Sequence, residues 1–380
     1  MDYWTVVDIV YNITLSLSFF ILMVLMFYIG RRGFKANNKY GGISTIICGI
    51  CFLIFGFYNL FARFFHYPYN GFMVWWIGIN LFIAWIFFML IKRVTNKIEL
   101  ENKNNELGKN KKSILTRYVE RLRIENPYRE NISFKMEVIR KSFHLMGLLL
   151  VVGYFGFFLV PPLIQLISDG VVILIHDIKP AYEFLWGNVS LFPYTIADPL
   201  GLKHLTMMAL IGALMFAIIS DLIRILKSPE YSIFNFLTRS MLRNKEISAT
   251  GPQIYIITGF IFSYMLYLAG LIDILPFFAG VLIACLSDAA VALIGRRYGK
   301  HKVMVRSRDY KSIEGFVAGA IVSYLIGLII VGPIYAIIAM VIFFLTDYLP
   351  IYTADNILNP IFIPIGIQLF VLILGLPVGW

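Results

Sequence analysis

The amino-acid sequence predicts an all-α membrane protein, a polytopic bundle of about ten transmembrane helices. Of its 380 residues, 59% are hydrophobic and only 14% are charged, whereas about a quarter of the residues in a typical soluble domain are charged. Several apolar runs exceed the roughly 18 residues that are needed to cross a bilayer. The net charge of +11 resides between these runs, which is typical of cytoplasmic loops and argues against nucleic-acid binding.

Apolar windows place the expected helices in order along the chain. The first run has no positive n-region and is too long for a cleaved signal, so we expect it to remain as a helix. Cys48 and Cys51 lie one helical turn apart in the second run, which is typical of packing residues. The expected spans are residues 6–29, 43–62, 72–92, 143–166, 205–225, 252–272, 275–295, 312–331, 333–348 and 360–379.

The loop charges predict the orientation of these helices. The first loop carries Arg31, Arg32 and Lys35, and every second loop thereafter is also basic, so we expect these loops on the cytoplasmic side and both termini outside. Residues 93–131 interleave acidic and basic side chains, as a charged helical linker does. We therefore expect an accessory region of three spans (1–92), this cytoplasmic linker (93–131) and a membrane-embedded catalytic domain (132–380).

Charged motifs recur at the predicted cytoplasmic ends of the helices. Glu137, Arg140, Lys141 and His144 share one helical face before the fourth span, where they would bind phosphate or only form an interfacial Glu137 to Lys141 pair. Asp221 and Arg224 end the fifth span and precede a loop with Arg243 and Glu246. Here an i,i+3 structural pair and substrate binding are equally good interpretations.

The seventh span contains Asp288 within an apolar helix. An ionised Asp near the bilayer centre costs roughly 2.5 to 3.5 kcal/mol on insertion scales, which indicates a functional role. Gly295 and Gly299 continue a stripe of small residues that would let a neighbouring backbone approach closely. The eighth span then begins at Lys311, Glu314 and Gly315, where a helix N-terminus would bind an anion or would simply be capped by Ser312 and packed.

Oxygen ligands gather where the ninth and tenth spans meet. Asp347 lies near the end of the ninth span, and Asp355 and Asn356 precede Pro360. Such hard ligands suit Mg²⁺, which usually takes one or two carboxylates together with substrate phosphates.

These motifs, taken in order, resemble the CTP-dependent polyprenol kinases, a family that includes dolichol kinases, yeast-type diacylglycerol kinases and phytol kinases. Phosphatidate cytidylyltransferases are distantly similar. The resemblance covers about residues 133–380 and leaves the first three spans outside it. This chain departs from the family's pattern in two places. It has Ala354 where members often carry a second Asp, and the interval between Gly299 and Lys311 is long for the family. The matching motifs begin at Glu137, Arg224, Ser287, Lys311 and Asp355.

The resemblance implies phosphorylation of a lipid alcohol with CTP as donor and Mg²⁺ as cofactor. Its partners would be the lipid alcohol, the nucleoside triphosphate and membrane lipids, without nucleic acid. A cytidylyltransferase making a CDP-lipid is the first alternative, a transporter using Asp221 and Asp288 the second, and a structural scaffold the third. The implied roles are catalysis by Asp288 and Glu314; nucleotide or phosphate binding by Arg140, Lys141, His144, Arg224, Arg243, Gly295, Gly299, Lys311 and Gly315; metal binding by Asp288, Glu314, Asp355 and Asn356; and support by Glu137, Asp221, Glu246 and Asp347.

Overall fold

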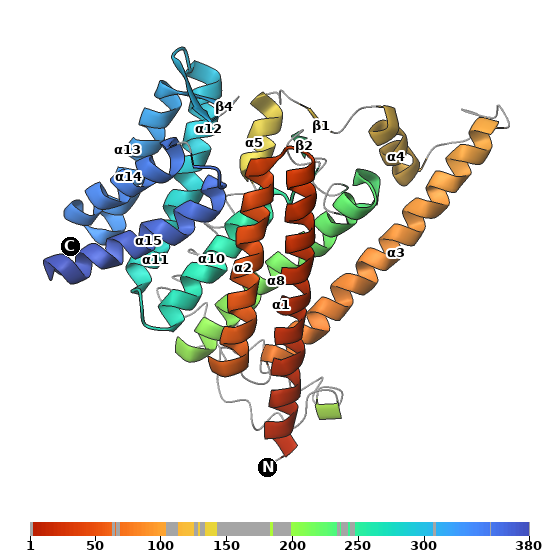
Figure 1. The fold of residues 1–380 in the computed structure, drawn as a ribbon, viewed down its shortest axis with the longest axis horizontal. Helices are drawn as coiled ribbons and strands as arrows, with labels where there is room; N and C mark the ends of the chain where they lie inside the picture. The colour runs from red at the N-terminus through yellow and green to blue at the C-terminus, as the bar shows by residue number, and fades with distance from the viewer. Residues whose placement is uncertain are drawn as a thin grey trace, which may run out of the picture.

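In the computed structural model, the chain forms a helical bundle with two short strand pairs (Figure 1). The described part comprises residues 3–62, 65, 69–103, 113–124, 128–129, 134–142, 183–184, 199–233, 236, 242–243, 248–306, 309–349 and 351–379. All structural statements below concern these residues.

Three long apolar helices form the N-terminal part of the bundle. They are α1 (Tyr3–Lys35), α2 (Lys39–Ala62) and α3 (Tyr69–Lys103). The first two form an antiparallel hairpin whose turn contains Asn37 at φ 57°, a conformation that Asn tolerates better than most residues. The hairpin packs closely where Gly42 meets Gly33, because a Cβ on Gly33 would lie 3.1 Å from the Gly42 Cα atom.

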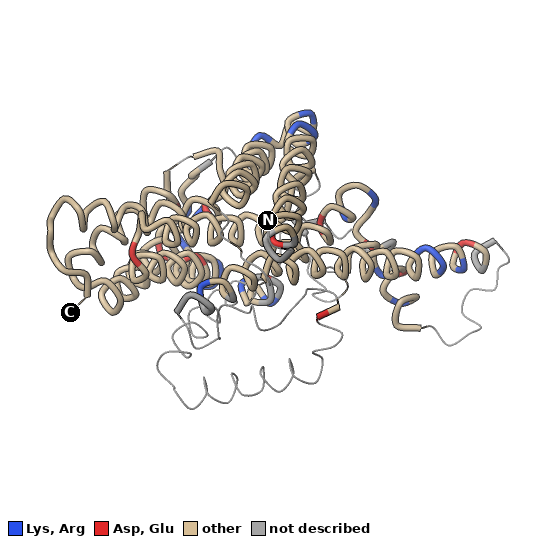
Figure 2. Tube along the Cα trace, turned by 90° about the horizontal axis from the view of Figure 1, so that it is seen from below, with Lys and Arg blue, Asp and Glu red and all other residues tan. Residues whose placement is uncertain are grey.

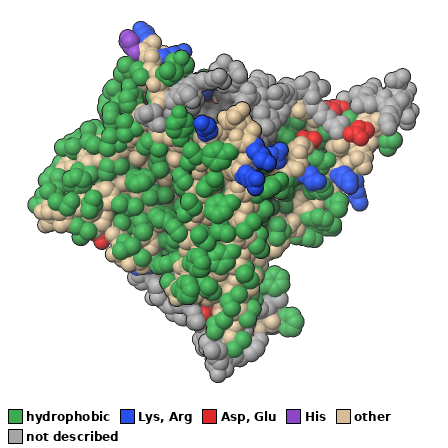
Figure 3. All heavy atoms as spheres, in the orientation of Figure 1, with side chains coloured by type: hydrophobic (Ala, Val, Ile, Leu, Met, Phe, Trp, Pro, Cys, Tyr) green, Lys and Arg blue, Asp and Glu red, His purple; other side chains and the backbone are tan. Residues whose placement is uncertain are grey.

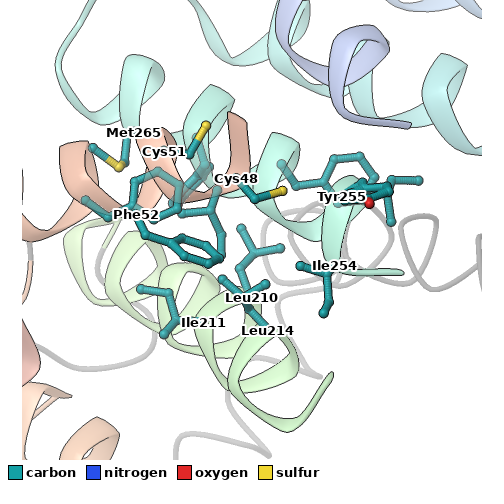
Figure 4. Packing of buried hydrophobic residues seen from close by; sticks show 14 of the residues in the cluster. Cys48, Cys51, Phe52, Leu210, Ile211, Leu214, Ile254, Tyr255 and Met265 are labelled. Atoms are coloured by element: carbon teal, nitrogen blue, oxygen red, sulfur yellow. The ribbon is translucent and has the colours of Figure 1, made fainter. Parts of the chain in front are cut away.

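The largest hydrophobic core joins this hairpin to two later helices, α8 (Pro199–Leu226) and α10 (Pro252–Leu268). Figure 4 shows side chains of all three elements meeting in this core. Cys48 and Cys51 are buried free thiols within it, which agrees with their predicted role in packing. The labelled residues are Cys48, Cys51 and Phe52 from α2, Leu210, Ile211 and Leu214 from α8, and Ile254, Tyr255 and Met265 from α10.

The C-terminal helices form a second packed group. A continuous helical segment runs through α11 (Ile274–Leu282), a π-helical turn (Ile283–Ser287) and α12 (Asp288–Tyr298). A strand pair, β3 (Lys302–Arg306) with β4 (Asp309–Ser312), connects it to α13 (Ile313–Val331). The chain ends with α14 (Pro333–Tyr348) and α15 (Asp355–Leu374).

The last helix begins five residues earlier than its predicted span, so Asp355 and Asn356 lie in its first turn. The prediction started the span at residue 360 because the apolar window begins there, after the polar Asp355, Asn356 and Asn359. Here Pro360 and Pro364 lie inside α15 and pack onto glycines of neighbouring helices. A Cβ on Gly259 would come within 2.5 Å of Pro360, and one on Gly280 within 2.6 Å of Pro364. Transmembrane helices tolerate internal proline when neighbouring helices enclose it.

Seven described helical segments are long and apolar enough to cross a membrane, and α10 and α14 are shorter apolar helices. Nine of the ten predicted spans therefore correspond to described apolar helices, and the tenth, 143–166, lies outside the described residues. Figure 3 shows a broad hydrophobic surface with Lys and Arg gathered towards its upper edge. We call that end, with residues 36–38, α5 (Phe134–Ser142), the β3–β4 pair and the far end of α3, the basic end (Figures 1 and 2).

The predicted boundary at residue 92 lies inside α3, which continues to Lys103 and carries both basic and acidic residues along its far end (Figure 2). The following helix α4 (Ile114–Ile124) folds back against it. Phe87, Ile91 and Ile98 of α3 form a small apolar cluster with Tyr118 and Val119 of α4. Part of the predicted charged linker is thus packed onto the bundle, and the division into domains stays a prediction.

Candidate functional site

Two ion pairs hold α5 against α12 at the basic end. Lys141 donates to Asp288 Oδ2, and Glu137 accepts from Arg296 Nη2 at 3.1 Å. Both carboxylates are nearly inaccessible, with 12% of the Asp288 side chain and 1% of the Glu137 side chain exposed. Lys141 therefore pairs across two helices with Asp288, and the alternative Glu137 to Lys141 pair within one helix is not formed.

Asp288 directly follows the π-helical turn Ile283–Ser287. Such single turns insert an extra residue into a helix and are frequent at functional sites. Ser287 is fully buried, and its hydroxyl has no hydrogen-bond partner among the described residues. The turn therefore places a buried hydroxyl and a carboxylate on successive residues.

Lys311 forms the centre of a second charged group, next to the first. Its ammonium donates to Asp347 Oδ1 at 2.6 Å, to the Asp347 carbonyl at 2.9 Å and to Asp355 Oδ2 at 3.2 Å. Burial alone would lower the pKa of Lys311, but the charges of Asp347, Asp355 and Asp288 raise it overall. Because the charge of Asp288 also acts on Lys311, the two charged groups lie within electrostatic range of each other.

The oxygen atoms around Lys311 partly fit a divalent cation. Asp347 Oδ2 is buried without a hydrogen-bond donor among the described residues, and Asp355 lies on the other side of the same ammonium. No group of three or more His, Cys, Asp or Glu in the described part of the chain is placed to hold a metal ion. A divalent cation held by Asp347 or Asp355 would therefore need most of its ligands from substrate phosphates and water.

The glycines of the predicted phosphate motifs form a tight seam between α12 and α13. A Cβ on Gly315 would lie 2.5 Å from the Val291 carbonyl oxygen and 2.8 Å from the Gly295 Cα atom. A Cβ on Gly299 would lie 2.5 Å from Ser312 Cβ. Ser312 also caps α13 by accepting from the Gly315 N–H group at 3.1 Å. The Ser312 cap and the close helix packing, which the sequence analysis gave as the alternative to anion binding, are both present.

Glu314, the second predicted catalytic residue, lies at the start of α13 next to His301. Its Oε1 atom is 2.7 Å from His301 Nδ1 and accepts from the His301 backbone N–H group at 3.2 Å. About 27% of the Glu314 side chain is exposed. No described contact joins Glu314 to Asp288 or Asp355.

Asp221 and Arg224 form the predicted i,i+3 pair, with Arg224 Nε donating to Asp221 Oδ1 at 2.6 Å. Both side chains are buried, and both extend to the segment before α10. Arg224 Nη2 donates to the Ala249 carbonyl at 2.9 Å, and Asp221 Oδ2 accepts from the Gly251 N–H group at 2.7 Å. The pair thus holds the start of α10 against the C-terminal part of α8.

The N-terminal hairpin also contacts this region, which the sequence motifs did not predict. Ser44 Oγ accepts from the backbone N–H group of Ala354, the residue before Asp355, at 2.9 Å. The hydroxyl oxygen of Thr45 lies 3.0 Å from the hydroxyl oxygen of Thr250. A sequence pattern gives no signal for such contacts, because the partners are about 200 and 310 residues away in the chain.

Several predicted site residues can be placed only in part. Arg140 lies on α5, and Arg243 lies on β2 (Leu242–Arg243), which pairs in parallel with β1 (Tyr128–Arg129); both side chains lie outside the described part of the structure, as do His144 and Glu246. Asn356 lies in the first turn of α15, where its N–H group donates to Asp355 Oδ1 at 3.0 Å.

Comparison with protein-family models, curated proteins and solved structures finds no match to this chain. The family resemblance of its motifs therefore stays a prediction.

Proposed function

We propose that this protein transfers the γ-phosphate of CTP to the hydroxyl group of a polyprenol-type lipid alcohol at the cytoplasmic face of the cell membrane. The observation that carries the proposal is the convergence of Lys141, Asp288, Lys311, Asp347 and Asp355 at the basic end of an apolar bundle. Phosphoryl transfer depends mainly on positioning and on neutralising charge. A buried charged group next to lipid-facing helices suits a reaction between a soluble nucleotide and a lipid.

Asp288 is the proposed acceptor of the proton from the lipid hydroxyl. Its hydrogen bond from Lys141 to Oδ2 holds the carboxylate in place. The hydroxyl oxygen would form a bond to the γ-phosphorus as the bond to the β-phosphate oxygen breaks, leaving CDP. Ser287, directly before Asp288, would donate a hydrogen bond to the same reacting group.

Lys311 is the proposed phosphate-binding cation, together with Arg140 on α5 and Arg243 on β2. In the structure its ammonium already lies between Asp347 and Asp355, so the phosphate would join an existing ionic group. Mg²⁺ held by Asp347 or Asp355 would neutralise the charge of the transferred phosphate. Asn356 completes the proposed metal-binding set, whereas Glu314 pairs with His301 and has no described contact with Asp355.

Product analysis tests the proposal directly. The purified protein is incubated in detergent with Mg²⁺, a panel of lipid alcohols and of lipid phosphates, and CTP labelled in either the α- or the γ-phosphate. We expect γ-label, but not α-label, in the lipid, and greater incorporation from CTP than from ATP.

Transfer of the α-label to a lipid phosphate would instead identify the alternative, a CDP-lipid synthase related to phosphatidate cytidylyltransferases. Absence of label from every lipid would refute both enzymes. A transporter needs a gradient across a membrane, so turnover in detergent would exclude transport as the source of the signal.

A further inference from the structure

A cavity of about 350 Å³ lies beside α4, away from the charged groups of the proposed active site. Its described lining consists of Ile114, Arg117, Tyr118 and Arg121 from α4, with Phe236 opposite. The rings of Tyr118 and Phe236 meet edge to face at 5.2 Å. The cavity therefore combines an aromatic floor with two guanidinium groups from a single helix.

Arg117 and Arg121 are four residues apart and so lie on one face of α4. Arg117 is exposed and Arg121 half-buried. Neither guanidinium is in an ion pair in the described part of the structure. Two neighbouring guanidinium groups without carboxylate partners favour a phosphate, which they can bind with paired hydrogen bonds.

The position of α4 favours a lipid headgroup, rather than a soluble molecule, as the source of that phosphate. The helix packs on Phe87, Ile91 and Ile98, which lie at the predicted cytoplasmic end of the α3 span. Lys92 and Arg93 are exposed at the same level, as expected for basic residues among lipid headgroups. Ile114, of which 65% is exposed, adds an apolar side chain at the rim of the cavity. This combination of basic and apolar groups is typical of a helix at the membrane surface.

The cavity is also coupled to α8. The Tyr118 hydroxyl donates to the carbonyl groups of Pro229 at 3.4 Å and Ser232 at 3.5 Å. Ser232 Oγ lies 2.8 Å from Ser220 Oγ, next to Asp221 at the end of α8. The wall of the cavity is thus fixed to the bundle, which gives its guanidinium groups a defined support.

From these observations we infer that the cavity beside α4 binds the phosphate of an anionic lipid headgroup at the membrane surface. This site is separate from the pocket of the proposed kinase reaction. Arg117 and Arg121 bind the phosphate oxygens, while Tyr118, Phe236 and Ile114 contact the apolar part of the lipid next to the headgroup.

Lipid binding to the purified full-length protein tests this inference. Native mass spectrometry during titration with phosphatidylglycerol gives the apparent dissociation constant for the wild type and for the double variant Arg117→Gln/Arg121→Gln. The double variant Lys92→Gln/Arg93→Gln is the matched control, because it removes the same charge at the same level outside the cavity. We expect roughly 10-fold weaker binding in the cavity variant, which loses two charge-assisted contacts, and less than about 3-fold in the control.

Equal weakening by both double variants would overturn the inference, because it would indicate diffuse attraction to a basic surface. Unchanged binding in the cavity variant would overturn it as well. Phosphatidylcholine, whose headgroup is zwitterionic, should bind more weakly. Inorganic phosphate that displaces phosphatidylglycerol at similar concentration would show that the site takes free phosphate rather than lipid. The single variant Arg117→Gln, at an exposed position, provides the same test if the double variant does not fold.

Discussion

Helices α1–α3 and helices α8–α15 both bury polar side chains, but the two regions bury different kinds. In α1–α3 every described buried polar side chain is neutral. Asn59, for example, donates to the Asn12 carbonyl at 3.0 Å and to Ser16 at 2.9 Å. The later helices also bury neutral polar side chains such as Thr258 and Ser323, but in addition they bury the carboxylates of Asp221, Asp288 and Asp347.

This difference suggests which buried side chains have a role in function in addition to stabilising the fold. Neutral hydrogen bonds suffice to join α1, α2 and α3, whereas a buried charge costs far more to remove from water than an amide. A helix bundle held together only by packing would not need Asp288 and Lys311. We therefore propose a chemical role for Asp288 and Lys311, whereas the Asp221 to Arg224 pair joins α8 to α10 and the neutral groups of α1–α3 serve helix association.

The substitution Asp288→Asn tests this distinction with the largest expected effect. It keeps the size of the side chain but removes the proposed proton acceptor, so lipid phosphorylation should fall by ~10²- to 10⁴-fold. The variant should still elute as a folded protein. Near-normal turnover would remove Asp288 from the mechanism.

Asn59→Ala is the matched change in the other region. It removes two buried hydrogen bonds, each contributing about 0.5 to 1.5 kcal/mol, so it should lower the free energy of unfolding while turnover per folded molecule stays within about 2-fold. A loss of turnover as large as that of Asp288→Asn would erase the contrast between the regions.

Lys311→Met tests the cost of the buried charges of the later helices through its effect on the free energy of unfolding. It leaves Asp347 buried without its cation, and breaking a buried pair in this way costs about 3 to 5 kcal/mol. The double variant Lys311→Met/Asp347→Asn should recover much of this loss, although it should stay inactive. Unfolding titrations of both variants in mixed micelles measure the effect.

The pH dependence of the same pair has a defined sign. The pKa of Lys311 is raised above its ordinary value of 10.5, so the stability that its charge contributes is fully present at neutral pH. That contribution should be lost only when the pH rises through the raised pKa. A loss already between neutral and mildly alkaline pH would contradict this arrangement.

Gly315→Ala should have a smaller effect, confined to packing. The added methyl group would meet the Val291 carbonyl oxygen at 2.5 Å, so α12 and α13 must separate, at a cost of about 1 to 3 kcal/mol. Gly78→Ala is the control in α3, because nothing lies within 4 Å of its added Cβ; it should stabilise the helix by up to about 1 kcal/mol. Similar stability of both variants would argue against the tight seam.

The sequence predicted the apolar helices well because long apolar runs and loop charges are local signals. It also offered the Ser312 cap and the Asp221 to Arg224 pair as alternatives to ligand binding, and both are present, with partners three residues apart. It did not predict that Lys141 pairs with Asp288, because that choice depends on how α5 packs onto α12. The π-helical turn before Asp288 likewise has no recognisable local pattern.

The early start of α15 illustrates a second limit. The apolar window began at residue 360, but the helix starts at Asp355 and includes Pro360, which packs against Gly259. The contact of Ser44 with Ala354 was also unexpected, because the family resemblance begins only near residue 133. Both errors arise from contacts between segments that are distant in the chain.

Site-directed labelling with a membrane-impermeant thiol reagent tests the central claim, that the charged motifs meet at one side of the membrane. Single cysteines replace Asn38, Lys302 and Tyr352 near the basic end and Leu271 near the opposite end, in a protein whose buried Cys48, Cys51 and Cys285 have been replaced by alanine. The account predicts that the first three positions react only in inside-out vesicles and that Leu271→Cys reacts only in right-side-out vesicles. Reaction of Lys302→Cys and Tyr352→Cys from opposite sides would contradict it.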